Sequence, residues 1–258
     1  MILTENNYYS REANLEYMSV SQYKQFRTCE AAAVAQIRGE WERPKTTALL
    51  VGSYVDSWFE GTLDTFRENN PEIFKRDGSL KSDYIQAEEI IRFVQRDPIF
   101  MEFMAGRKQV ILTRKLFGVP WKIKIDSYHP ESMIVDLKVM RAMERVMGKS
   151  FVEHWGYDLQ MAVYSEVEGH SLNTYLAVVT KQDPPDKAII HIPDWRRYEI
   201  LEDMEPRMPR IIQVKSGELP PRRCEVCEYC RATKMLTGPI DFELVGLSSE
   251  EIRAVLGT

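Results

Sequence analysis

The sequence predicts an α/β or α+β fold in which helices flank a mixed central β-sheet. Amphipathic helical periodicity dominates the first hundred residues, period-two alternation runs through residues 109–139, and a second pair of strands follows near residues 173–193. The chain has 258 residues, of which 44% are hydrophobic, so it is long enough to bury a full core. We therefore expect a single domain over residues 1–258.

The elements follow one another in a regular order. They are helices at 19–38, 46–61 and 82–105, strands at 109–116, 121–127 and 133–139, a helix at 141–168 and strands at 173–180 and 187–193. Ser19 or Ser21 is expected to cap the first helix, and Asp194 opens a late one. The segment 220–234 is rich in cysteine, and Ser248 caps a short final helix.

The stretch VPWKIKIDSYHPESMIVDLKV, residues 119–139, reads as a hairpin with one apolar and one charged face. Trp121, Ile123 and Ile125 point one way, so the intervening side chains point the other way. A turn follows around Glu131, and the second strand again alternates. The charged face carries Lys122, Lys124, Asp126, Asp136 and Lys138.

A turn centred on Glu131 makes Asp126 and Asp136 cross-strand neighbours. Two carboxylates on a half-buried sheet are costly unless a positive charge lies between them, and a hard cation with oxygen ligands meets that need. The same pattern also fits a solvated hairpin whose charged face is turned to water. Taken alone, the hairpin does not separate these two interpretations.

Two helices add polar groups to this pattern. Asp56 and Glu60 are four residues apart on the second helix, so both carboxylates lie on one face. Tyr157, Gln160 and Tyr164 lie on one stripe of the helix expected at 141–168.

The order of these residues resembles the PD-(D/E)XK nuclease superfamily, in its RecB-like and phage-exonuclease branch. The matching positions are Gly52 with Asp56, Asp126, Asp136 with Lys138, and Gln160 with Tyr164. RecB-like relatives usually have His four residues after that Gly, whereas this chain has Asp56. A carboxylate can still bind Mg or Mn, so the resemblance points to the lambda- and RecE-type recombination exonucleases and implies a restriction-endonuclease-like core.

The resemblance also implies roles for individual residues. Asp126, Asp136, the Leu137 carbonyl and Asp56 would hold Mg or Mn, and Lys138 would position the attacking water. Gln160 and Tyr164 would orient the lysine or the substrate, and Arg27 would meet a terminal phosphate of DNA.

The activity implied is a Mg-dependent 5′ to 3′ exonuclease on linear double-stranded DNA in phage-type homologous recombination. A trimeric ring and a single-strand-annealing partner belong to the same expectation. Two alternatives remain: an iron-sulfur RecB-like nuclease acting on single-stranded ends in recombination or CRISPR adaptation, and a non-catalytic DNA-end binding module. The presence of Asp126, Asp136 and Lys138 argues against the last.

The cysteines form a second candidate metal site. Cys224, Cys227 and Cys230 make a C-x2-C-x2-C run, which can supply three thiolates to one cubane cluster, and Cys29 is the remaining cysteine. The resemblance supports Cys29 as the fourth ligand, because AddB and CRISPR-adaptation nucleases hold a 4Fe-4S cluster with one early and three late cysteines. Zinc, or reduced thiols without metal, are the alternatives.

The charge is uneven along the chain. The whole chain has 34 basic and 39 acidic residues, which argues against a general nucleic-acid coat. Between residues 107 and 149, however, ten Lys or Arg stand against four Asp or Glu. Lys122, Lys124 and Arg141 are therefore expected to hold the DNA backbone, although any single one of them could be a solvated surface charge.

The sequence does not support a nucleotide hydrolase, a secreted protein or a membrane protein. The chain contains no GxxxxGK[ST] phosphate loop, so a helicase or ATPase activity would need a partner. Its first residues have no signal-peptide pattern, and no run of about 18 apolar residues occurs. We expect a cytoplasmic phage or prophage protein of a bacterial host, without membrane contact.

Overall fold

The computed structural model describes residues 1–42, 46–236, 238–239, 241–247 and 251. The chain divides into two compact units. The first unit comprises Met1–Arg43, Lys115–Trp121 and Asp203–Thr258, and the second comprises Pro44–Arg114 and Lys122–Glu202. The single-domain organisation expected from the sequence stays a prediction. In the described part of the chain, none of the helices has the length and apolar character needed to span a membrane.

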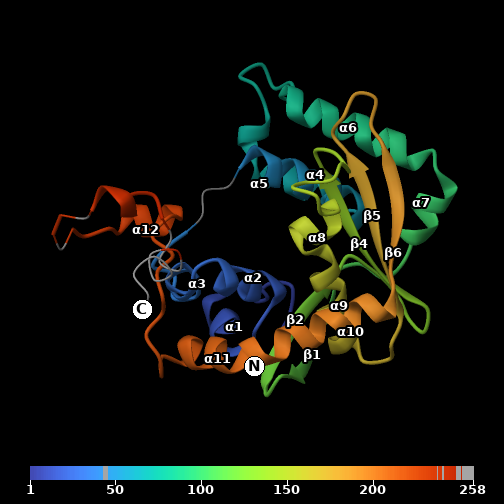
Figure 1. The fold of residues 1–258 in the computed structure, drawn as a ribbon. Helices are drawn as coiled ribbons and strands as arrows, with labels where there is room; N and C mark the ends of the chain where they lie inside the picture. The colour runs from blue at the N-terminus through green and yellow to red at the C-terminus, as the bar shows by residue number, and fades with distance from the viewer. Residues whose placement is uncertain (43–45, 237, 240, 248–250, 252–258) are drawn as a thin grey trace. The chain divides into compact units, whose positions relative to one another are not determined.

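The second unit is built on a four-stranded mixed sheet of order β3-β4-β5-β6 (Figure 1). Its strands are β3 (Ser127–His129), β4 (Met133–Met140), β5 (Asn173–Thr180) and β6 (Lys187–Ile192). β4 pairs with β5 in parallel, whereas β3 and β6 pair antiparallel with their neighbours. The mixed sheet flanked by helices expected from the sequence, in the restriction-endonuclease-like arrangement, is confirmed.

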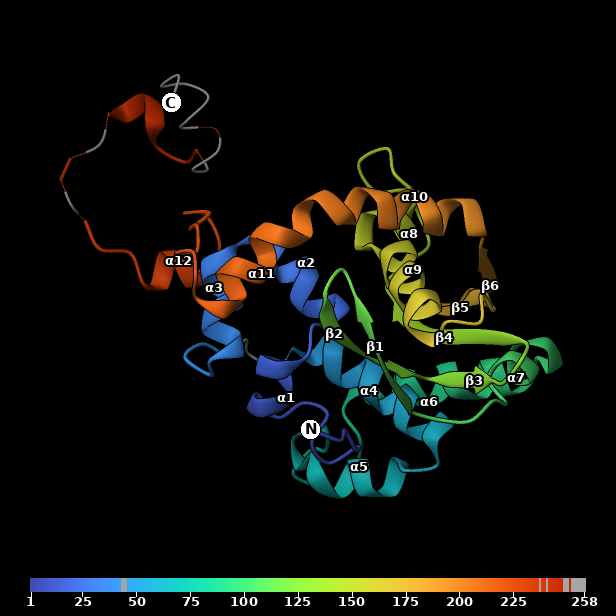
Figure 2. The same ribbon diagram turned by 90° about the horizontal axis from the view of Figure 1, so that it is seen from below.

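Helices cover both faces of this sheet (Figure 2). One face packs on α4 and α6 through a core that contains Val55, Ile90, Val135 and Leu137. The helix α9 lies on the opposite face, which is the face that Asp136 occupies. The helices and short 3-10 turn of this unit are α4 (Thr47–Glu60), α5 (Leu63–Asn69), η1 (Pro71–Ile73), α6 (Ser82–Gln95), α7 (Pro98–Phe103), α8 (Phe151–Trp155), α9 (Tyr157–Glu168) and most of α10 (Asp194–Met204).

A separate two-stranded sheet is formed by β1 (Val110–Leu116) and β2 (Val119–Ile125). Its turn uses Phe117 and Gly118, both with positive φ, which is the backbone that a tight hairpin turn requires. The tip of this hairpin, Lys115–Trp121, belongs to the first unit. There Met18 pairs with Trp121, whose ring is fully buried.

The remainder of the first unit is helical. Its elements are α1 (Arg11–Glu16), α2 (Val20–Thr28), α3 (Glu30–Ile37), η2 (Glu205–Arg207), α11 (Met208–Ser216), α12 (Glu228–Ala232) and η3 (Phe242–Leu244). The Ser19 side chain caps α2 by accepting a hydrogen bond from the Gln22 N–H, as expected. The expected cap at Ser248 lies outside the described residues.

Three helices that were predicted to be continuous are interrupted in the structure, so these predictions are wrong in that respect. The helix at 19–38 is broken at Cys29, whose extended backbone (φ −162°, ψ 110°) ends α2 and precedes α3. The helix at 82–105 is broken before Pro98, and the Asp97 carboxylate caps the new helix. Of the helix at 141–168, residues 141–149 are not helical, and Gly156 (φ 62°) separates α8 from α9.

Candidate active site

The second unit brings the aspartates of the charged hairpin face together. The β3–β4 register pairs Ser127 with Val135, so the turn is centred on Glu131 (φ 65°), and the next position in that register sets Asp126 opposite Asp136. Asp126 follows β2 at a bend, where its Oδ2 accepts a 2.9 Å hydrogen bond from the Leu137 N–H. The expected pairing of the strand 121–127 with the strand 133–139 is wrong for most of its length, because β2 pairs with β1 in a separate sheet and only Ser127–His129 pair with β4. The chain between them still brings Asp126 to the edge of β4 beside Asp136.

Asp136 is buried within this site, with only 2% of its surface exposed. Its Oδ1 accepts a 2.6 Å hydrogen bond from Gln160 Nε2. Its Oδ2 forms an ion pair with Lys138 Nζ but receives no hydrogen bond of normal geometry. The Lys138 ammonium in turn lies 5.0 Å from the centre of the Tyr157 ring, so the lysine is held between a carboxylate and an aromatic face.

Asp56 enters the site from α4. Burial raises the pKa of Asp56 to about 7, and the charges of Asp136 and Glu60 act in the same direction. Lys138 and Lys124 act in the opposite direction but do not cancel the effect. The helix therefore adds a third carboxylate to the pair on the hairpin.

The same crowding affects Asp126 and Lys138. Burial, together with the charges of Asp136 and Asp56, raises the pKa of Asp126 well above its ordinary value. Burial alone would lower the pKa of Lys138, but the charges of Asp136 and Asp126 raise it, so the ammonium stays protonated. Burial and the neighbouring carboxylates thus disfavour the charged forms of Asp56 and Asp126 unless a further positive charge is present.

A divalent cation fits this set of donors. Carboxylates from a bend, a strand and a helix act on one another through their charges, and one of their oxygens, Asp136 Oδ2, is buried without a regular hydrogen bond. The N–H and C=O of one strand residue point to the same edge, so the Leu137 carbonyl shares the edge where its N–H meets Asp126. Such oxygens are the ligands that Mg²⁺ or Mn²⁺ accepts.

The two candidates on α9 act on different parts of the site. Gln160 binds Asp136 directly, whereas the Tyr164 hydroxyl donates a 3.1 Å hydrogen bond to the Lys124 carbonyl. Gln160 therefore fixes a carboxylate, and Tyr164 fixes the β2 backbone one residue before Ile125.

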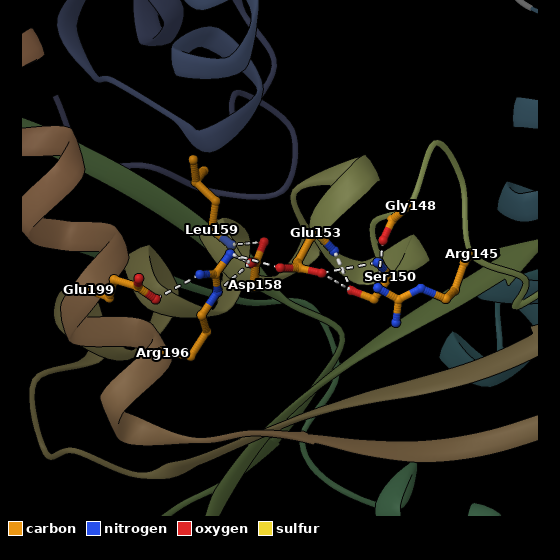
Figure 3. Close-up of polar contacts among 8 residues, drawn as sticks. All are labelled: Arg145, Gly148, Ser150, Glu153, Asp158, Leu159, Arg196 and Glu199. Carbon is orange, nitrogen blue, oxygen red and sulfur yellow. Dashed lines mark hydrogen bonds and ion pairs between the residues drawn. The ribbon is translucent and has the colours of Figure 1, made fainter.

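An ion-pair network holds α9 in place (Figure 3). Arg196 of α10 donates a 2.9 Å hydrogen bond from Nε to Asp158, a buried residue in the first turn of α9. Its guanidinium also lies 3.6 Å from Glu153, which forms a capping box with Ser150 at the start of α8. The helix that carries Gln160 is thus tied to both of its neighbours.

Gln109 also reaches the site, although its only expected role was as the first residue of a strand. Its Nε2 lies 3.5 Å from Asp126 Oδ1, and its backbone has a positive φ of 51°. No motif or periodicity marks it, because it approaches Asp126 through a local backbone conformation. Tyr157 was visible as part of a helix stripe, but its contact with Lys138 was not.

Gly52, the glycine of the nuclease motif on α4, has open space where a side chain would lie. A Cβ built at Gly52 would meet no heavy atom within 4 Å, and its φ lies in the ordinary range. Gly52 is one helical turn before Asp56 and shares its face of α4. Among the residues that the structure describes, no contact therefore accounts for a glycine inside this helix.

The basic residues expected to hold DNA differ in exposure. The expected surface position of Lys122 is wrong, because both faces of β2 are covered at this point and the residue is only 2% exposed. Burial lowers the pKa of Lys122 to about 8. Lys124 is half-buried, and Arg141 is exposed just after β4. In the first unit, Arg27 is exposed and lies 3.7 Å from Asp203.

The four cysteines are brought together in the first unit. The sulfur atoms of Cys29, Cys224, Cys227 and Cys230 all lie within 4.8 Å of one another. A sequence separation of about two hundred residues is closed here, as the sequence predicted.

The family model for a PDDEXK-like domain of unknown function (DUF3799) matches residues 19–233. The chain belongs to this family. The resemblance to PD-(D/E)XK nucleases found in the sequence is thereby confirmed, and the match encloses the candidate active site and all four cysteines.

Two solved structures provide further comparisons. The chain is 50% identical to a protein of Eubacterium rectale described as a "Putative exonuclease", with a TM-score of 0.92 over 95% of this chain and 99% of that one. SSO0001 is 13% identical, with a TM-score of 0.32 over 86% of this chain and 96% of that one, a similarity too low to support an inference. No curated protein matches the chain.

Proposed function

We propose that this protein is a Mg²⁺- or Mn²⁺-dependent deoxyribonuclease that digests DNA from its ends. The observation that carries the proposal is the pairing of Asp136 with Lys138 on one face of β4, with Asp136 fixed by Gln160 and Asp126 bound to the edge of the same strand. Support also comes from the family and from the exonuclease description of the similar Eubacterium rectale protein.

The residues divide the chemistry between them. Asp126, Asp136 and Asp56, with the Leu137 carbonyl, would hold the cation, which when bound lowers the pKa of a water and polarises the scissile phosphate. The Lys138 ammonium, protonated and directed by Asp136 and the Tyr157 ring, lies where it can stabilise the negative charge that grows on the phosphate. Gln160 leaves Asp136 one oxygen for the cation by binding the other.

DNA approaches over the open side of α4. Gly52 leaves room beside Asp56, since a Cβ there would meet no protein atom. Arg141 and Lys124 supply positive charge next to the hairpin, and Arg27 is the candidate for a terminal phosphate.

The finer features of the proposal come from the resemblance to lambda- and RecE-type exonucleases. They are 5′ to 3′ digestion of linear double-stranded DNA, a trimeric ring, a single-strand-annealing partner and a cytoplasmic role in phage recombination. An iron-sulfur nuclease that acts on single-stranded ends is the second candidate and the alternative that the resemblance implies; four cysteines are grouped as it requires, but their sulfur separations of 3.6 and 3.9 Å fit one ion better than a cluster.

Purified protein should be tested on 5′-labelled linear duplex, on single strands and on closed circles, with Mg²⁺ and with chelator. The proposal predicts cation-dependent loss of linear duplex and no attack on circles. Asp136→Asn and Lys138→Ala should each lower the rate by roughly a thousandfold, the equivalent of several kcal/mol of transition-state stabilisation. Asp64→Asn and Lys75→Ala, matched changes at exposed positions, should not. Binding without cleavage would leave the end-binding module, and preference for single strands would favour the second candidate.

A further inference from the structure

The cysteine cluster of the first unit has a geometry that distinguishes between metals. Cys29 lies between α2 and α3, and Cys224, Cys227 and Cys230 lie at and before α12. Cys29 and Cys230 are buried, and their sulfurs are 3.6 Å apart. The Cys224 and Cys230 sulfurs are 3.9 Å apart.

These separations fit four thiolates around one ion. With Zn–S bonds of about 2.3 Å, the corners of a tetrahedron lie about 3.8 Å from one another. The Cys29–Cys230 and Cys224–Cys230 separations lie on either side of this value, and every sulfur pair lies within 4.8 Å. The pairs are also much too far apart to be disulfides, whose sulfurs are about 2.05 Å apart.

An iron-sulfur cubane does not fit. Each of its four irons occupies its own corner and each thiolate points outward from one iron, so the cysteine sulfurs are spread to roughly 6 Å. A two-iron cluster likewise separates the sulfurs on different irons beyond the observed limit. The four sulfurs enclose room for one ion and not for a cluster.

We propose that Cys29, Cys224, Cys227 and Cys230 bind a single zinc ion in a closed tetrahedral S4 site, in place of the 4Fe-4S cluster that the family resemblance implies. Four protein ligands leave no open position, so the site is structural. It joins the start of α3 to the segment 222–232, two parts of the first unit that are far apart in sequence.

The chain around the site is built to hold this arrangement. The extended backbone at Cys29 interrupts the helix between α2 and α3. The Cys227 N–H donates to the Cys224 sulfur at 3.3 Å, and the Cys230 N–H donates to the Cys227 sulfur at 3.5 Å. Such N–H···S contacts orient ligating thiolates and offset part of their charge.

A second set of contacts ties the same two segments together beside the sulfurs. The Ala31 N–H donates to the Arg222 carbonyl, and the Glu30 carboxylate accepts from the Arg222 N–H. Glu30 also binds Arg210 through both of its oxygens. The separation of the sulfurs is therefore fixed by a frame that does not depend on the thiols themselves.

The test is the metal content of the full-length protein, expressed with iron and zinc both supplied and purified without oxygen. We expect about one zinc per chain, iron only in traces and no brown cluster absorbance. About four irons per chain with that absorbance, or neither metal above the level of a Cys227→Ser variant, would overturn the proposal. Thr28→Ser, an exposed change next to Cys29, is the control and should keep its zinc.

Cobalt substitution covers the case in which Cys227→Ser fails to fold. Wild-type protein grown with Co²⁺ should show the intense d–d bands and sulfur-to-cobalt charge transfer of a tetrahedral S4 site. A six-coordinate cobalt spectrum would contradict the proposal. The inactive Asp136→Asn variant should contain as much zinc as the wild type, so this result is independent of the nuclease proposal.

Discussion

Replacing Gln160 with Ala should weaken the cation site without removing any of its ligands. Gln160 Nε2 donates a 2.6 Å hydrogen bond to Asp136 Oδ1, and Asp136 is only 2% exposed, so water does not easily replace the amide. A hydrogen bond to a charged group contributes about 1.5–3 kcal/mol. That range corresponds to a loss of roughly 10- to 100-fold, the usual effect of removing a partner of a metal ligand.

The assay is the initial rate of linear-duplex digestion as a function of Mg²⁺ concentration. Gln160→Ala should raise the Mg²⁺ needed for half-maximal rate by roughly 10- to 100-fold and recover much of its rate at high Mg²⁺. Gln213→Ala, a change at an exposed helix position, is the matched control. An unchanged Mg²⁺ requirement in Gln160→Ala, with the rate reduced at every concentration, would refute the reasoning.

Three more predictions concern the neighbours of the cation. Since burial raises the pKa of Asp56 to about 7, the metal-free protein should lose stability as the pH rises from about 4 through 7, where the folded state holds more protons than the unfolded one. Thermal melts with chelator should show this slope, Asp56→Asn should reduce it, and a melting temperature that rises over this range would contradict it. Tyr157→Leu should slow cleavage by roughly 2- to 30-fold, because the ring beneath Lys138 is lost. Tyr157→Phe keeps the ring and should cleave at close to the wild-type rate. Equal losses of rate in both variants would show that the hydroxyl is the group that matters. Gly52→Ala should stabilise α4 by about 1 kcal/mol in urea unfolding yet weaken DNA binding in a filter assay, and unchanged binding would show that the open space is not used by DNA.

The register of Ser127–His129 on β4 could be predicted because a period-two pattern and a turn at Glu131 together fix it. The pairing of β2 with β1 in a separate sheet could not, because the alternation of β2 continues into β3 without a break. Helical spacing likewise set Gln160 and Tyr164 on one stripe, and the structure shows both reaching the hairpin. Helical spacing could not show that Gln160 binds a carboxylate and Tyr164 a backbone carbonyl.

Two kinds of feature could not be predicted from the sequence. One is the backbone conformation of single residues, and the other is whether both faces of a strand are covered. The extended residue Cys29 and the left-handed Gly156 interrupt helices whose periodicity continues across the break. Lys122 follows the alternation of β2, but the second face of that strand is also covered, so its side chain is buried. Gln109 reaches Asp126 from a positive-φ position that no residue pattern marks.

The most direct test of the account is single-turnover cleavage of end-labelled linear duplex by Asp126→Asn, with enzyme in excess over DNA. The account predicts DNA binding within a few-fold of wild type and cleavage in Mg²⁺ slower by roughly a thousandfold, because one carboxylate of the cation site becomes a neutral amide. Cleavage at the wild-type rate would contradict the account, since it would place the chemistry away from the carboxylates of the hairpin.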